Sequence, residues 1–380
     1  MYWTLAKKRL FGTGVAIIVW ALFSVNPLFG QDKVCLQKAA AYTAGKFSFS
    51  ACSADFNGDG KPDVAVVNYN GNDLVIMLNN GDGTFKAPVI YPAGHYPTSV
   101  KAGDFNGDGK MDLAVSNVGS ETISIFLGNG DGTFQAKKDF SAGAFPCCMV
   151  IADFNHDKKL DIAVANDSSN TVTIFTGNGD GTFTNAGAYR VGEYPSPLVA
   201  ADLNGDGNLD IVVTNTGGNS VSVLLGKGDG TFNRASEYRV GSYPNCVTTG
   251  DFNRDGKQDI AAVNSASGTV SVLLNKGDGT FGKSTDLQAG GGGPISIVAV
   301  DMNKDSAMDL ALCNAGTNNI SVLVNDGKGN FSDPVSFPTG ISPVCILVDD
   351  FNGDGYWDLL TVNNNEAGTI SVLLGCPAKQ

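Results

Sequence analysis

Histidine is nearly absent from this chain, which has only His95 and His156 among its 380 residues. Neither has a nucleophile beside it, and no Gly-x-Ser-x-Gly motif, phosphate-binding loop or histidine-rich metal triad occurs. The eight cysteines form no Cys-x-x-Cys pair, which argues against zinc ribbons and dithiol redox sites. The sequence therefore lacks the common signatures of hydrolytic, nucleotide-dependent and zinc-dependent catalysis.

Positive charge is also scarce. Lysine and arginine number 25 against 38 acidic residues, which gives a net charge of −13. Such an acidic chain is not expected to bind nucleic acid, because the phosphate backbone is recognised mainly by basic residues.

The first 30 residues have the composition of a secretory signal peptide. A basic start at Lys7, Lys8 and Arg9 precedes an apolar run from Leu10 to Val25, and Asn26-Pro27 and Gly30 follow. An uncleaved membrane anchor is the alternative, since the exit lacks Ala-x-Ala and the run is near the lower length limit for a span. We expect export to the periplasm, the cell surface or the medium. Contact with a membrane is expected only if this segment is retained.

Residues 31–380 contain a nine-residue pattern, Asp-x-Asn-x-Asp-(Gly)-x-x-Asp, that recurs seven times. The copies begin at Asp55, Asp104, Asp153, Asp202, Asp251, Asp301 and Asp350, at intervals of 49 residues except for one of 50. A fixed period of this length indicates one structural unit repeated within a single domain.

Each repeat reads as four short strands. In the second copy, the apolar residues 99–102 precede the acidic loop, 113–115 form a strand buried on both faces, and 123–127 form a third strand. A tight Gly-Asp-Gly-Thr-Phe turn at 130–134 leads to a fourth strand that extends to about Ala142. No helical periodicity occurs after residue 31. The fold class is therefore all-β, a seven-bladed β-propeller of four-stranded antiparallel blades.

The acidic loop, the Gly-Asp-Gly-Thr-Phe turn and their fixed spacing together resemble the FG-GAP/VCBS repeat proteins, which include the seven-bladed propeller of integrin α chains. The turn recurs in the first five copies, is altered at 327–331 in the sixth and is missing from the seventh. The resemblance covers residues 34 to 376.

The last repeat stops after its third strand, and the missing fourth strand is expected from the N-terminal side. Residues 42–47 align with 91–96 one period later, so 34–44 is predicted to pair with 370–374 and close the ring. Cys35 and Cys376 would then lie on neighbouring strands, where either a disulfide or two free thiols would fit.

The motif also predicts metal binding. Alternating oxygen donors, a glycine that permits a sharp turn, a backbone carbonyl at the seventh place and a returning carboxylate suit calcium better than magnesium, zinc or copper. An EF-hand is excluded, because no copy has Glu at the twelfth place or flanking helices. Up to seven Ca²⁺ ions are expected. The predicted ligands are Asp55, Asn57, Asp59, Lys61, Asp63, Asp104, Asn106, Asp108, Lys110, Asp112, Asp153, Asn155, Asp157, Lys159, Asp161, Asp202, Asn204, Asp206, Asn208, Asp210, Asp251, Asn253, Asp255, Lys257, Asp259, Asp301, Asn303, Asp305, Ala307, Asp309, Asp350, Asn352, Asp354, Tyr356 and Asp358.

Charge supports this interpretation. Loss of the three basic residues of the leader would leave −16, and seven divalent ions would bring that to −2. Loops three and six are irregular, with Lys158 and Ser306 in place of the turn glycine, and weaker binding is expected there. The alternative for any loop is that side-chain-to-backbone hydrogen bonds hold it without an ion.

The opposite end of the blades carries a series of aromatic residues at the start of successive repeats: Phe47, Tyr96, Phe145, Tyr194 and Tyr243. Exposed rings there would bind a sugar or a peptide, whereas the alternative is that they wedge between neighbouring blades.

These features favour an exported, monomeric, calcium-binding module for non-catalytic recognition or adhesion, with an extracellular carbohydrate or protein as its ligand. The alternative is a calcium-dependent carbohydrate-active enzyme, similar to a polysaccharide lyase, on the same scaffold.

Overall fold

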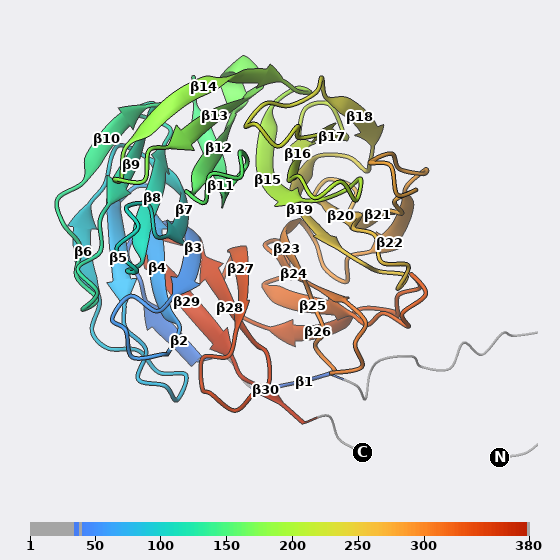
Figure 1. Cartoon of the computed structure of the whole chain (residues 1–380). Coiled ribbons are helices and arrows are strands. Elements are labelled where there is room, and N and C mark those ends of the chain that lie inside the picture. Colours follow the sequence, from blue (N-terminus) through green and yellow to red (C-terminus); the bar gives the residue numbers. More distant parts are fainter. Residues whose placement is uncertain (1–33, 38–39, 378–380) are drawn as a thin grey trace, which may run out of the picture.

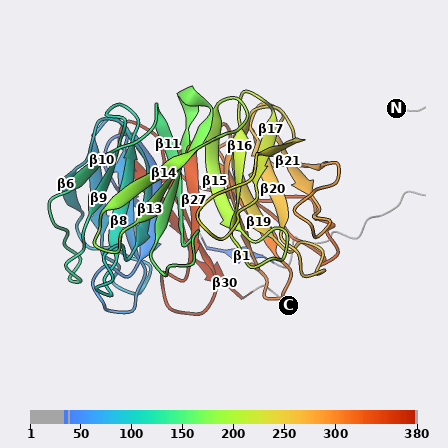
Figure 2. The same cartoon turned by 45° about the horizontal axis from the view of Figure 1, so that its top comes forward.

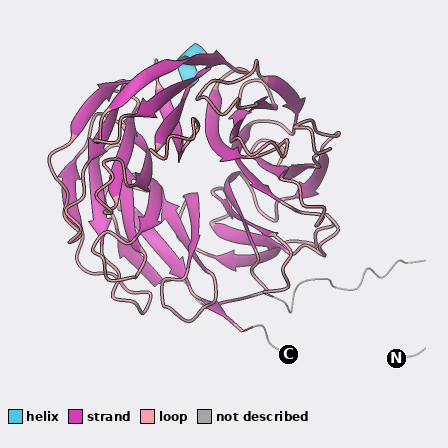
Figure 3. Ribbon diagram, viewed as in Figure 1, coloured by secondary structure: helices cyan, strands magenta, loops and turns pink. Residues whose placement is uncertain are grey.

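The computed structural model describes residues 34–37 and 40–377. The predicted signal peptide lies outside the described residues. Seven four-stranded antiparallel sheets are arranged as blades around a common axis (Figures 1 and 3). The prediction of an all-β, seven-bladed propeller is confirmed.

The blades follow one another along the chain, each running from the innermost strand outward. Blade 1 contains β3 (Ser48–Ala54), β4 (Asp63–Asn68), β5 (Asp73–Met77) and β6 (Val89–Pro92). Blade 2 contains β7 (Pro97–Gly103), β8 (Asp112–Asn117), β9 (Thr122–Phe126) and β10 (Lys138–Ser141). Blade 3 contains β11 (Pro146–Ala152), β12 (Asp161–Asn166), β13 (Thr171–Gly177) and β14 (Phe183–Arg190).

The remaining blades repeat this order. Blade 4 contains β15 (Pro195–Ala201), β16 (Asp210–Asn215), β17 (Ser220–Leu224) and β18 (Ser236–Arg239). Blade 5 contains β19 (Pro244–Gly250), β20 (Asp259–Asn264), β21 (Thr269–Leu273) and β22 (Thr285–Gln288). Blade 6 contains β23 (Pro294–Val300), β24 (Asp309–Asn314), β25 (Asn319–Leu323) and β26 (Val335–Pro338). Blade 7 contains β27 (Pro343–Asp349), β28 (Asp358–Asn363), β29 (Thr369–Leu373) and the N-terminal β2 (Ala40–Thr43).

Burial varies from strand to strand within a blade. The second strand is buried at every position, as in β8, because neighbouring blades cover both of its faces. The fourth strand is mostly exposed and shorter than predicted, since β10 begins at Lys138 while Phe134 forms only an isolated bridge with Gly128. An outer strand has one neighbour, so its ends are weakly constrained.

The ring closes as predicted, with one refinement. β2 pairs with β29 in antiparallel register, Tyr42 opposite Ile370. The predicted single strand 34–44 is divided, because β1 (Cys35–Leu36) pairs separately with β30 (Gly375–Cys376), and a disulfide joins Cys35 to Cys376.

Neighbouring blades are joined by the Gly-Asp-Gly-Thr-Phe turn. Phe134 of blade 2 packs edge-to-face on Phe56 of blade 1 with ring centroids 5.5 Å apart, and the N–H of Gly132 donates to the Phe56 carbonyl at 2.9 Å. Four further pairs of blades repeat this ring contact. Blade 7 lacks the turn, and Val34 instead joins the apolar cluster that contains Met302 and Ile346. The turn therefore links a blade to the preceding one.

Helix is minimal in the described part of the chain, where the 3₁₀ turn η1 (Asp167–Ser169) is the one helical element. No helix among the described residues is long and apolar enough to cross a membrane.

Candidate functional site

The acidic loops lie between the first and second strands of each blade, next to the Gly-Asp-Gly turns, so both occupy one end of the propeller. The aromatic residues precede the first strands and therefore lie at the other end. Figure 2 shows the blades inclined, with both ends in view. The predicted division of the molecule into an acidic end and an aromatic end is present.

The first aspartate of each loop folds the loop around itself. In blade 2, Asp104 Oδ1 accepts from the N–H of Gly107 at 2.7 Å, and Oδ2 accepts from that of Gly109 at 2.8 Å. Asp108 in turn accepts from the Lys110 N–H at 3.0 Å, which lowers the pKa of the Asp108 carboxyl. These side-chain-to-backbone bonds hold the loop in a tight curl.

The ninth residue of the motif has a structural role that the sequence analysis missed. Asp112 is fully buried, and its two carboxylate oxygens accept from the backbone N–H groups of Phe105 at 2.9 Å and Gly128 at 2.7 Å. The same pair of bonds occurs in all seven blades. This carboxylate therefore ties the acidic loop to the end of the third strand.

The pKa of the ninth aspartate responds to burial and to the charges of two other carboxylates in the same loop. Burial, with a smaller contribution from the charges of Asp305 and Asp301, raises the pKa of Asp309 to about 7. In three other blades the pKa of the ninth aspartate is about 6 for the same reasons. Each loop is thus a concentrated acidic site that a cation would neutralise.

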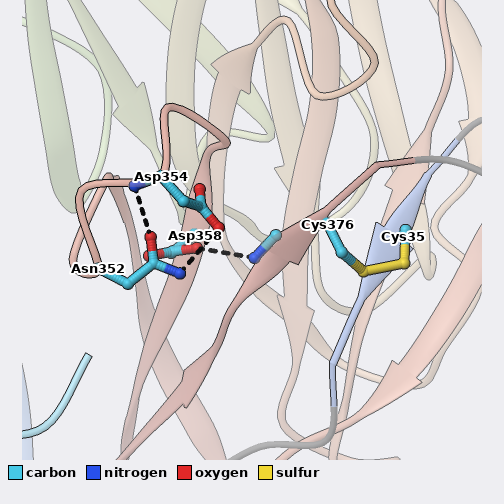
Figure 4. The surroundings of a disulfide bond; sticks show 6 residues. Cys35, Asn352, Asp354, Asp358 and Cys376 are labelled. Carbon is cyan, nitrogen blue, oxygen red and sulfur yellow. Dashed lines mark hydrogen bonds between the residues drawn. A yellow bond between two sulfur atoms is a disulfide. The ribbon is translucent and has the colours of Figure 1, made fainter. Parts of the chain in front are cut away.

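The donor set matches the ligands that Ca²⁺ prefers, since every predicted ligand atom is a carboxylate, amide or carbonyl oxygen. As the side chains stand, however, these oxygens face backbone amides, as Figure 4 shows for Asn352 and Asp354 of the seventh loop. No group of three or more acidic, histidine or cysteine side chains in the described residues is arranged to hold a metal ion. Calcium binding stays a prediction.

At the aromatic end, each of the seven blades places one residue in the left-handed backbone region before its first strand. Five of these are the predicted aromatic residues, and the other two are Gly293 and Ser342. Tyr96, Phe145, Tyr194 and Tyr243 are exposed, and Phe47 is half-buried. The rings of Tyr96 and Tyr194 rest on Gly119 and Gly217 of their own blades, so that a Cβ on either glycine would meet a ring carbon.

A glycine two residues before each aromatic position explains how this end is held together. A Cβ on Gly94 would lie 2.5 Å from Cγ of Asn117, a fully buried residue that ends β8. The same approach of glycine to asparagine recurs in every blade. The sequence signal for this contact is the paired recurrence of Gly and Asn in every repeat.

The aromatic end also contains a pocket of about 450 Å³. It is lined by Cys147, Asp167, Tyr194, Pro195, Ser196, Thr216, Gly217, Tyr243 and Asn245, from blades 3, 4 and 5. Of the predicted ligand-binding aromatics, it brings Tyr194 and Tyr243 together and leaves Phe47, Tyr96 and Phe145 outside. A second pocket, of about 440 Å³, lies between the acidic loops of blades 4 and 5.

Comparison with known families agrees with this architecture. The profile of the FG-GAP-like repeat matches six overlapping segments, residues 55–115, 114–164, 153–213, 202–262, 251–312 and 301–361. The chain belongs to the FG-GAP-like repeat family. None of the curated proteins matches this sequence.

Solved structures similar to this FG-GAP-like propeller share its fold at low sequence identity. BBS1N in complex with ARL6DN has a TM-score of 0.66 at 14% identity, over 91% of this chain and 98% of that one. A catalytically inactive virginiamycin B lyase from Staphylococcus aureus with quinupristin has a TM-score of 0.61 at 14% identity, over 89% of this chain and 99% of that one. A protein from Lactobacillus plantarum has a TM-score of 0.60 at 13% identity, over 78% and 86%.

Apart from the closing disulfide, the cysteines of this FG-GAP-like chain are free thiols: Cys52, Cys147, Cys148, Cys246, Cys313 and Cys345. Burial raises the pKa of Cys52 to about 12 and also raises those of Cys246 and Cys345. Thiols with so little thiolate are poor nucleophiles and poor metal ligands.

The irregular loops of this FG-GAP-like chain carry backbone strain. Lys158 in loop three and Ser306 in loop six occupy the place of the turn glycine, with φ of 65° and 68°. At the fourth place of the same two loops, His156 and Lys304 also have positive φ. Arg254 adds a further case in loop five, at 58°. Residues with a Cβ are disfavoured in this region.

Replacement of Lys158 by glycine is therefore expected to stabilise the protein by about 1 kcal/mol, because the left-handed conformation costs glycine least. Urea unfolding of Lys158→Gly would measure the gain. The reverse change in the regular second loop, Gly109→Lys, is the matched control and should destabilise by a similar amount. A stability of Lys158→Gly equal to or below that of the parent chain would contradict the prediction.

Proposed function

We propose that this chain is an exported, monomeric, calcium-stabilised propeller that binds an extracellular carbohydrate or protein at its aromatic end, for recognition or adhesion. One observation carries this proposal, the contrast between the two ends. At the acidic end, the Asp and Asn side chains are engaged in holding their own loops. At the aromatic end, the exposed rings of Tyr194 and Tyr243 line a pocket that offers both apolar and hydrogen-bonding groups.

The calcium part of the proposal rests on chemistry and charge. The first, third, fifth and ninth side chains and the seventh carbonyl of each motif would hold the ion, which would supply structural rigidity and charge neutralisation. The lysines at the seventh place lie near the fifth aspartate, at 3.5 Å in the second loop, and offset only part of the acidity. Export is proposed from the composition of residues 1–30, and it is consistent with a disulfide at the ring closure.

The structural neighbours support ligand binding in general. One is a propeller solved with a protein partner, and another is a lyase solved with quinupristin. At their low identity they show a shared fold and indicate no shared ligand. The uronate-lyase alternative needs a base such as Lys, Arg or Tyr near a metal-bound uronate, and the pocket between the acidic loops of blades 4 and 5 contains Lys257 together with Asp202.

Binding to an array of glycans and extracellular-matrix proteins tests the proposal. We expect a ligand whose binding falls at least tenfold in a double variant with alanine at Tyr194 and Tyr243, because these exposed rings supply contact area. The control double variant has alanine at Met308 and Trp357, exposed apolar residues of the acidic end, and should bind normally. Depolymerisation of uronic-acid polysaccharides without binding on the array would show the proposal to be wrong.

A further inference from the structure

We propose that the pocket between the inner strands of blades 3, 4 and 5 is a binding site for a neutral sugar, held against Tyr194 and Tyr243 by hydrogen bonds to Asp167 and Asn245. The inference rests on the proposed function and assigns its ligand class and its location. Part of the pocket's lining, Cys147, Ser196 and Asn245, comes from β11, β15 and β19. These three inner strands follow one another around the axis (Figure 1). The pocket's volume of about 450 Å³ is within the range of small-molecule sites.

The pocket breaks the sevenfold repetition. Asp167 follows the asparagine that ends β12, and no other blade has a carboxylate at that place: the equivalents are Tyr69, Val118, Thr216, Ser265, Ala315 and Asn364. Asn245 is likewise the only amide at its position, whose equivalents are Phe49, Thr98, Cys147, Ser196, Ile295 and Val344. A structural role common to all blades therefore does not account for these two side chains.

Five polar side chains of the pocket lack partners in the described part of the chain, whereas the side chains of Thr216 and Cys147 donate to backbone carbonyls. Within residues 34–37 and 40–377, no hydrogen bond or ion pair is made by the side chains of Asp167, Ser196, Asn245, Tyr194 or Tyr243. Asp167 and Asn245 are half-buried, and burial raises the pKa of the Asp167 carboxyl. Groups that are partly removed from water without a partner gain most from a ligand that supplies hydrogen bonds.

The two tyrosines provide the apolar part of the site. Tyr194 and Tyr243 are 57% and 54% exposed, and the Tyr194 ring is supported from below by Gly217. Their backbones are fixed, because the N–H of each donates to an asparagine of the preceding blade, Asn170 or Asn219, at 2.9 and 2.8 Å. Rings held in place in this way bind a flat apolar surface at little entropic cost.

The charge and hydrogen-bonding character of the lining select the ligand class. Asp167 is the one charged side chain of the lining, so a phosphate, a sulfate or a uronate would be repelled. An ammonium or guanidinium group has no acceptor atom, and would leave the donors of Asn245, Ser196 and the phenols unused. A sugar hydroxyl both donates and accepts, and the C–H face of a pyranose suits an aromatic ring. A neutral sugar satisfies the whole lining.

Calorimetric titration of the full chain in calcium-containing buffer tests the assignment. The probes are cellotriose, mannotriose, xylotriose and galactobiose as neutral sugars, trigalacturonate as an acidic sugar, and a capped Lys-Lys dipeptide as a cation. We expect a neutral sugar to bind, and Asp167→Asn and Tyr194→Ala each to raise its Kd at least tenfold. Tyr96→Ala is the matched control, since Tyr96 has the same place in blade 2 but lies outside the pocket. It should leave the Kd unchanged.

The outcomes separate this inference from the proposed function. If only the dipeptide binds and Asp167→Asn abolishes its binding, the ligand is cationic, and the sugar assignment is wrong while recognition at the aromatic end stands. If a neutral sugar binds but is lost in Tyr96→Ala and kept in Tyr194→Ala, the location is wrong. Absence of binding by all four neutral sugars up to about 5 mM overturns the inference, whatever the array of proteins and glycans shows.

Discussion

Removal of calcium is expected to lower the Tm of this propeller by on the order of 10 °C. An ion that binds only the folded chain stabilises it by about 2.7 kcal/mol at a hundredfold excess over its Kd. Several occupied loops add up, and for a chain of this size each kcal/mol corresponds to about 1–2 °C. The physical reason is that an ion would offset the repulsion among the carboxylates of each loop. In the sixth loop, burial above all, and then the charges of Asp305 and Asp301, raise the pKa of Asp309.

Calorimetric scans with calcium and with a chelator would measure the shift, together with a metal count per chain. Magnesium at the same concentration is the matched control and should restore little of the Tm, because it demands a stricter octahedral geometry. In Asp104→Ala the second loop is disabled while the others remain, so the count should fall by about one ion. Equal Tm values with and without chelator would contradict the prediction and favour loops that are held by the observed side-chain-to-backbone bonds alone.

Loss of the disulfide between Cys35 and Cys376 is expected to reduce the free energy of unfolding by about 5 kcal/mol. The bond joins residues separated by 341 positions, and the entropy that a cross-link removes from the unfolded chain grows with the length of the closed loop. The strand pairing that completes blade 7 is short, with four residue pairs between β2 and β29.

Urea unfolding of the double variant Cys35→Ser, Cys376→Ser would show the loss. The control is Cys147→Ser, which removes a half-buried free thiol. Alkylation of the parent protein without reductant should leave Cys35 and Cys376 unmodified. A midpoint unchanged in the double variant, or labelling of either cysteine in the parent, would mean that strand pairing alone closes the ring.

Repetition made most of the fold predictable from the sequence. A pattern present in seven copies fixes the number of blades, and the truncated last copy points to the N-terminal strand that completes it. The predictions that failed concern segments in which burial does not impose a regular pattern of apolar residues. The fourth strands are exposed, so the start of β10 was misplaced, and the closing segment divides into β1 and β2 because it pairs with two successive parts of blade 7.

The candidate sites were predictable to different degrees. The residue types of the acidic loop indicate an oxygen-lined cation site, yet they do not reveal that Asp112 accepts two backbone hydrogen bonds across the blade. The aromatic series was visible at period 49. The pocket was not, because Asp167 and Asn245 are 78 positions apart in the sequence and meet only through the curvature of the ring.

The disulfide that joins the first and last strands of the domain has a mechanical consequence. A pulling force applied to the chain before Val34 and after Pro377 reaches Cys35 and Cys376 first, and the covalent bond between them transmits it directly. The rest of the propeller connects the same two cysteines by a second, longer route, so the blades carry almost no tension. If such a domain were stretched between two attachment points, it would keep its shape until the sulfur–sulfur bond was reduced.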